Sequence, residues 1–186
     1  MLEWVSHVSR ATHAVLRSTK WLDRQGSRGF TGRTLHESEL MPVAAQYDPS
    51  NVFAKILRGE MPCTRVFEDA ETLAFMDIMP RCDGQTLVIP KAPVRNILDA
   101  TPADLAIIMR TTQIVSRAAM RAFGAQGVTI QQFNEAAGGQ VVFHMHVHVL
   151  PRHDGERLKP HTGQMADRTV LERQADKIRA VLALNQ

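Results

Sequence analysis

The chain is predicted to fold as an α+β domain built on an antiparallel sheet. Two observations support this class: short strand-like runs are joined by turn signals, and one long helical stripe, at residues 105–123, separates the first three runs from the last two. Strands that meet in hairpins and are connected by one long crossover helix are typical of α+β domains. We therefore expect a five-stranded antiparallel sheet with one long central helix, a short N-terminal helix and a C-terminal helix.

The first half of this domain is predicted to hold one helix and three strands. Residues 51–58 have apolar side chains at helical spacing, and Gly59 ends the run. Residues 64–68 and 72–77 are expected to be strands on either side of a turn. Residues 86–90 form a third strand that is apolar on both sides, so it should lie in the centre of the sheet.

The second half begins with the long helix. Thr101 is expected to cap it, Pro102 occupies its first helical position, and its apolar stripe continues to Gly124. The remaining expected elements are two strands and a closing helix, at residues 128–133, 143–150 and 167–184.

Three histidines alternate with apolar residues in the last of these strands. Side chains in a strand point to the two faces in turn, so His144, His146 and His148 should share one face while Phe143 and the other apolar residues pack on the opposite one. A single strand histidine is usually surface decoration or a satisfied buried group. Strict alternation of three, opposite an apolar face, favours a functional row.

The spacing of this row argues against one metal ion held by all three rings. A rise of about 3.3 Å per residue places neighbouring histidines about 6.6 Å apart and the outer two about 13 Å apart. Zinc binds nitrogen at about 2.0–2.1 Å and could join one adjacent pair at most. The row suits an extended anion instead, because neutral imidazole is a good nucleophile near pH 7 and its neighbours can donate to phosphate oxygens. The turn Gly138-Gly139-Gln140 before the run is expected to be either an anion-binding nest of backbone N–H groups or an ordinary turn.

At this point the chain resembles a known family. The run from Asn134 through Gly139-Gln140 to Leu150 is similar to the signature of the histidine triad (HIT) nucleotide-binding and hydrolase proteins. A second region supports the resemblance in the right order, in three segments at residues 51–62, 74–80 and 83–91. The similarity covers about residues 47–186, and it implies the same α+β architecture and usually a homodimer.

The resemblance also implies roles for individual residues. His146 would attack the α-phosphorus of a nucleotide, His148 would contact the phosphate, and His144 would orient the row. Gln140 would lie near the leaving group as a fourth catalytic residue. Asp77 would accept hydrogen bonds from both ribose hydroxyls; alternatively it caps the turn before Met79. The other implied substrate-binding positions are Phe53, Phe75, Ile78, Val52, Ile56 and Met61 around the base, and Asn134, Gly139 and the backbone N–H of Val141 near the phosphate.

The chain departs from the family pattern in three ways. Gln85 stands where many members have a supporting fourth histidine, so this position can form hydrogen bonds but cannot titrate. Val141 replaces a common hydroxyl residue, which removes a donor worth about 1.5–3 kcal/mol toward a charged acceptor. Zinc-binding members have ligands at the positions of Asn51, Ala54 and Pro93, and these residues are not ligands. We therefore expect no metal and no cofactor.

Composition limits the partners and the compartment. The 186 residues have a net charge of +3, and residues 1–46 carry six basic and four acidic side chains, so the rest is nearly neutral and no nucleic-acid partner is expected. No run approaches 18 apolar residues, so no membrane span is expected. Cys63 and Cys82 lack close spacing, which argues against a disulfide framework and is consistent with a reducing cytoplasm.

Residues 1–46 differ from the predicted HIT domain at 47–186. They are expected to be a flexible extension that is not part of the domain. A specific version of this idea is a mis-assigned start codon, in which case translation would begin at Met41. A short amphipathic helix near residues 3–17 and an Arg-rich transit peptide are alternative interpretations.

The leading hypothesis is a metal-independent hydrolase or transferase. It would cleave a purine nucleoside 5′-phosphate derivative, either a phosphoramidate or a mixed anhydride, through a nucleotidyl-histidine intermediate. The alternatives are a dinucleoside polyphosphate hydrolase, a nucleotide-binding scaffold with vestigial activity, and a metal-binding histidine strand.

Overall fold

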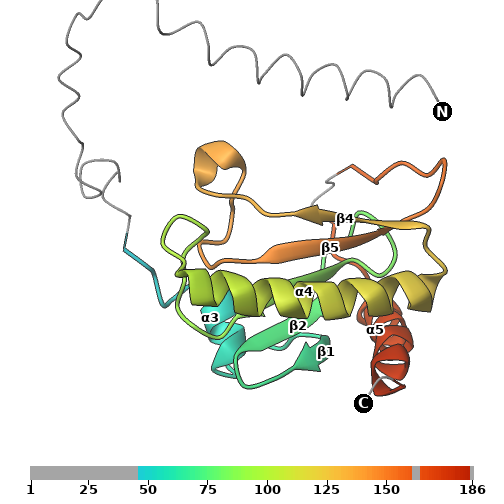
Figure 1. The fold of residues 1–186 in the computed structure, drawn as a ribbon, viewed down its shortest axis with the longest axis horizontal. Coiled ribbons are helices and arrows are strands. Elements are labelled where there is room, and N and C mark those ends of the chain that lie inside the picture. Colours follow the sequence, from blue (N-terminus) through green and yellow to red (C-terminus); the bar gives the residue numbers. More distant parts are fainter. Residues whose placement is uncertain (1–45, 161–163, 185–186) are drawn as a thin grey trace, which may run out of the picture. The chain divides into compact units, whose positions relative to one another are not determined.

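Five antiparallel strands form one open sheet with the order β1-β2-β3-β5-β4, so β3 lies in the centre as predicted (Figure 1). This computed structural model describes residues 46–160 and 164–184. The expectations for residues 1–45, including the helix near 3–17, lie outside the described residues. The strands are β1 (Arg65–Glu68), β2 (Thr72–Met76), β3 (Thr86–Pro90), β4 (Gly127–Gln131) and β5 (Val147–Arg152).

Three α-helices accompany the sheet, and each begins at a side-chain cap. In α3 (Val52–Leu57), the Asn51 side chain accepts a hydrogen bond from the backbone of Ala54. The long helix α4 (Pro102–Phe123) begins with a reciprocal capping box between Thr101 and Asp104 and ends at Gly124, whose φ is +62°. The closing helix α5 (Arg168–Ala183) is capped by Asp167.

The helices cover opposite faces of the sheet, and β2 shows how the sequence separates them. Its Leu73 and Phe75 pack against Phe53 and Ile56 of α3 in a small apolar cluster. Alternate residues such as Met76 belong to the larger core, in which the sheet packs against α4 and α5. Because side chains alternate along a strand, one short sequence supplies both cores.

The predicted α+β class is confirmed, and so is each element predicted within the described residues, but the boundaries of two strands are wrong. β4 spans Gly127–Gln131 rather than 128–133. β5 begins at Val147 rather than at Phe143. The facing strand β3 ends at Pro90, which has no N–H to continue the ladder, and the N–H of Met145 donates to the carbonyl of Val94 at 2.7 Å instead.

Because β5 begins only at Val147, Phe143 lies outside the strand. The next three apolar residues of the run, Met145, Val147 and Val149, lie in the main core as expected. Phe143 does not belong to that core, and the guanidinium of Arg95 lies 4.0 Å from its ring centroid.

Candidate active site

The three histidines form a continuous row that begins before β5 and ends within it. The rings of His146 and His148 have centroids 5.0 Å apart. The ring of Phe53 in α3 packs edge-on against the rings of both His144 and His146, with ring centroids 6.2 and 5.1 Å apart. His144 is fully buried and His146 is 6% exposed, whereas His148 is only partly buried. The helix α3 therefore shields the first two rings and leaves the third more open.

The hydrogen bonds of His146 determine which of its nitrogens can react. Its Nδ1 lies 2.7 Å from the backbone carbonyl oxygen of His144. A carbonyl can only accept a hydrogen bond, so Nδ1 of His146 must carry a proton. In the neutral ring the lone pair is then on Nε2, the nitrogen that can act as a nucleophile.

Burial keeps the first two rings neutral. The pKa of His146 is lowered to about 4, mainly by desolvation, with smaller contributions from the neighbouring His148 and His144. The hydrogen bond to the His144 carbonyl opposes this shift. The pKa of His144 is also lowered, mainly by burial, against a hydrogen bond to the carbonyl of Pro90. At neutral pH His146 is therefore an uncharged base with a free lone pair.

Gln85 connects the open end of the row to Asp77. Its Oε1 accepts a hydrogen bond from the backbone N–H of Arg81 at 2.7 Å, which turns its Nε2 toward Asp77 Oδ2, at 2.7 Å, and His148 Nδ1, at 3.4 Å. Because the amide nitrogen donates, a neutral His148 accepts on Nδ1 and carries its proton on Nε2. The residue that replaces a fourth histidine thus holds His148 as a donor without adding a charge.

The carboxylate of Asp77 has two roles in the fold. Oδ1 accepts the backbone N–H of Met79 at 2.9 Å, which is the turn cap considered as an alternative. Oδ2 accepts from Gln85 and lies 3.7 Å from Nδ1 of His148. Asp77 is therefore next to the histidine row, and its contact with ribose remains a prediction.

Four of the six residues expected around the base lie together on the α3 side of the sheet. Phe53, Ile56 and Phe75 are buried in the small cluster, and Val52 packs against it. Ile78 and Met61 are exposed, so they are available to a ligand. The contact of these residues with a base remains a prediction.

The glycine loop before the histidines is an ordinary turn over most of its length. Residues 136–138 form a 3-10 turn, η1, and the N–H groups of Gly138, Gly139 and Gln140 donate to carbonyls of Glu135 and Ala136. These three groups are not free to bind an anion, so the nest expected there is wrong. Val141 is 85% exposed, and its N–H has no acceptor among the described residues. Only this amide keeps the expected phosphate-binding potential.

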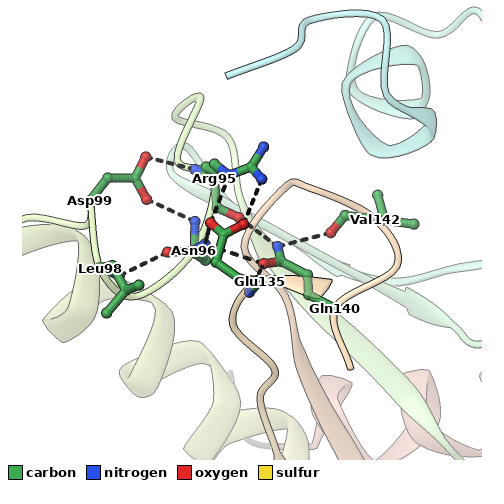
Figure 2. Close-up of polar contacts among 7 residues, drawn as sticks. All are labelled: Arg95, Asn96, Leu98, Asp99, Glu135, Gln140 and Val142. Atoms are coloured by element: carbon green, nitrogen blue, oxygen red, sulfur yellow. Dashed lines mark hydrogen bonds and ion pairs between the residues drawn. The ribbon is translucent and has the colours of Figure 1, made fainter. Parts of the chain in front are cut away.

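Gln140 is buried and faces the interior of its loop (Figure 2). Its Nε2 donates to the carbonyls of Arg95 and Val142, at 2.8 and 3.0 Å, and its Oε1 accepts from the Glu135 N–H and from Asn96, at 2.8 and 3.2 Å. Both polar atoms of its side-chain amide are thus occupied by the protein. A contact with the leaving group is a prediction that would require this network to open.

The same network contains an ion pair that the sequence did not predict. Glu135 has a φ of +60°, a strained value for a residue with a side chain. Two hydrogen bonds from Arg95, at 2.9 and 2.7 Å, and one from Asn96 hold its carboxylate (Figure 2). The bonds from Arg95 lower the pKa of Glu135 to about 2. Asn134 joins the same loops, because its Oδ1 accepts the N–H of Ile97 at 3.0 Å.

The described residues offer no alternative metal centre. Within 46–160 and 164–184, no three His, Cys, Asp or Glu side chains are grouped to hold a metal ion. The same ranges contain no helix with the length and apolar character to cross a membrane. Cys63 and Cys82 are both free thiols.

The fold and the site define a class of protein: an α+β domain that presents a row of three histidines at one end of an antiparallel strand. The family model of the HIT domain matches residues 58–155. The chain therefore belongs to the HIT domain family.

Individual relatives agree with this assignment. The adenylylsulfatase HINT3 of Arabidopsis thaliana is 36% identical over 107 residues, which make up 58% of this chain and 54% of that protein, so the chain spans about half of this relative. A HIT-like protein of Azospirillum brasilense is 41% identical over 122 residues, covering 63% of this chain and 96% of the relative. A HIT-like protein from Bartonella henselae, described as involved in cell-cycle regulation and solved with an unknown ligand, has a TM-score of 0.69 and 46% identity, covering 73% of this chain and 99% of that one.

Proposed function

We propose that this protein is a metal-independent hydrolase or transferase for purine nucleoside 5′-phosphate derivatives, with His146 as the nucleophile. One observation carries the proposal: Nδ1 of His146 is bound to the carbonyl of His144 at 2.7 Å, so the free lone pair is on Nε2. The HIT family membership supports nucleotides as the substrates.

The reaction would proceed in two displacements at phosphorus. Nε2 of His146 attacks the α-phosphorus, a P–N bond forms, and the bond to the leaving group breaks. The leaving group departs with the bonding electrons, and an amine leaving group takes up a proton from solvent. Water then attacks the phosphorus and loses a proton to solvent. The P–N bond breaks with its electrons returning to Nε2, which releases the monophosphate and restores the neutral ring. A second nucleophile in place of water would make the reaction a transfer.

The charges in the site fit this sequence of steps. The pKa of about 4 leaves His146 unprotonated at neutral pH, so no proton must be removed before attack. A weakly basic imidazole is also a good leaving group in the second displacement. His148 carries its proton on Nε2 and can donate it to a phosphoryl oxygen, while the Val141 N–H offers a second donor.

Two features support a purine mononucleotide with an activated phosphate. Asp77 lies beside His148, where its carboxylate can accept from ribose hydroxyls, and the base would lie against the apolar cluster around Phe53. One relative of this chain bears the name adenylylsulfatase. Adenylyl sulfate is a mixed anhydride, which favours this substrate class together with phosphoramidates.

The proposal is tested by trapping the intermediate. Wild-type protein and His146→Ala are incubated with adenosine 5′-phosphoramidate, adenylyl sulfate and diadenosine polyphosphates, with and without chelator. We expect AMP as the product, no effect of chelator, and a nucleotidyl adduct on His146 in quenched wild-type samples. His146→Ala should lose at least about 10²-fold in turnover and still bind AMP by calorimetry. Turnover that survives in this variant, or that depends on metal, would contradict the proposal.

The same panel decides between this function and its alternatives. A preference for diadenosine polyphosphates would indicate a dinucleoside polyphosphate hydrolase. The exposed Val141 side chain supplies no hydroxyl donor, and Gln85 cannot titrate, which are the features that favour a nucleotide-binding scaffold. Tight AMP binding without turnover of any substrate would support the scaffold. A homodimer and a cytoplasmic location belong to the same proposal, and sedimentation and cell fractionation test them.

A further inference from the structure

Tyr47 lies against the inner end of the histidine row, although it precedes α3 by several residues. It is the one tyrosine in the chain, and it lies outside residues 58–155, which the family model matches. Its hydroxyl is 2.6 Å from Nδ1 of His144, and the two rings meet edge to face with centroids 5.6 Å apart. Ninety-seven positions of sequence separate the two residues.

The polarity of this hydrogen bond is determined by the opposite edge of the His144 ring. Nε2 of His144 lies 2.9 Å from the carbonyl oxygen of Pro90, which can only accept, so Nε2 carries the proton. Nδ1 of the neutral ring is then a lone-pair acceptor, and the Tyr47 hydroxyl must donate to it. Two bonds of opposite polarity thus hold the fully buried ring in one tautomer and one orientation.

His144 connects this arrangement to the reactive ring. The backbone carbonyl of His144 is the group that accepts the Nδ1–H of His146 and so directs the lone pair of His146 to Nε2. Phe53 contacts both rings and leaves little room for His144 to turn independently. The hydrogen bonds at both edges of the His144 ring restrain the residue that carries this carbonyl.

We propose that Tyr47 is a positioning residue for the histidine row: its hydroxyl fixes the ring of His144, and through the His144 carbonyl it keeps His146 in the tautomer with Nε2 free. The kinetic part of this inference rests on the proposed function. The structural part concerns only the rings and can be measured without any substrate.

The variant Tyr47→Phe removes the hydroxyl and keeps the aromatic ring. Thr111→Val is the matched control, because it also removes one buried hydroxyl, which is bound to Thr72 at 2.9 Å away from the histidines. Imidazole ¹⁵N spectra of the full chain should show Nδ1–H for His146 in wild type and in Thr111→Val. In Tyr47→Phe the His146 signal should broaden or move toward the other tautomer.

Turnover of the best substrate gives the second measurement. Losing this hydrogen bond should lower kcat about tenfold in Tyr47→Phe with little change in KM, whereas Thr111→Val should retain wild-type kcat. Unchanged His146 signals in Tyr47→Phe would overturn the inference, whatever the kinetics. Changed signals in a protein that turns over no substrate would support the positioning role and refute the proposed function, so the two failures are distinguishable.

Discussion

Acidification should destabilise this protein through His146. Burial lowers the pKa of His146 from the usual 6.5 to about 4. The unfolded chain therefore binds a proton below pH 6.5 that the folded protein does not bind until about pH 4. The free energy of unfolding falls as pH falls through this window, since the proton binds the unfolded state first. Each pKa unit corresponds to about 1.4 kcal/mol, so the shift contributes about 3 kcal/mol to the free energy of unfolding. About 2 kcal/mol of this contribution is lost between pH 7 and pH 5.

The comparison that isolates this effect uses His146→Asn. The Asn amide can still donate to the carbonyl of His144 but cannot titrate, and all other groups remain in both proteins. Urea denaturation at several pH values between 7 and 4.5 gives the free energy of unfolding of each. We expect the wild type to lose about 2 kcal/mol more than the variant by pH 5. Parallel curves would show that His146 is not held neutral by burial, and the argument for a free Nε2 would lose its electrostatic support.

Two further predictions concern the loops around the site. Arg95→Lys removes the two-bond contact with Glu135, so amide hydrogen exchange of residues 134–142 should become faster and KM should rise. The control Arg110→Lys alters an exposed ion pair with Glu71 and should change neither quantity. Equal exchange rates in the two variants would contradict this. Gly84→Ala should cost about 2–4 kcal/mol in denaturant unfolding, because φ is +76° and the new Cβ would lie 2.5 Å from the Phe123 ring. Gly59→Ala has the same φ strain with no neighbour within 4 Å and should cost only about 1–2 kcal/mol; similar losses at both glycines would refute the steric argument.

Local chemistry made most of the fold predictable. The limits of α4 follow from Thr101, Pro102 and Gly124, and these signals act within a few residues of the helix ends. The alternation of histidines and apolar residues likewise indicated that Met145, Val147 and Val149 enter the core, because side-chain direction in a strand has a period of two. Asp77 caps the turn before Met79, which was one of the two roles considered from the sequence.

The sequence alone determined the number, type and order of the helices and strands over the described residues, and it indicated that three histidines share the site. Tertiary structure decided where β5 begins, because that depends on the missing N–H of Pro90 in a neighbouring strand. It also turned Gln140 inward and brought Tyr47 to His144 across ninety-seven positions. The physical reason is that the tautomer of a buried histidine depends on which donors and acceptors surround it, and these come from segments that only folding brings together.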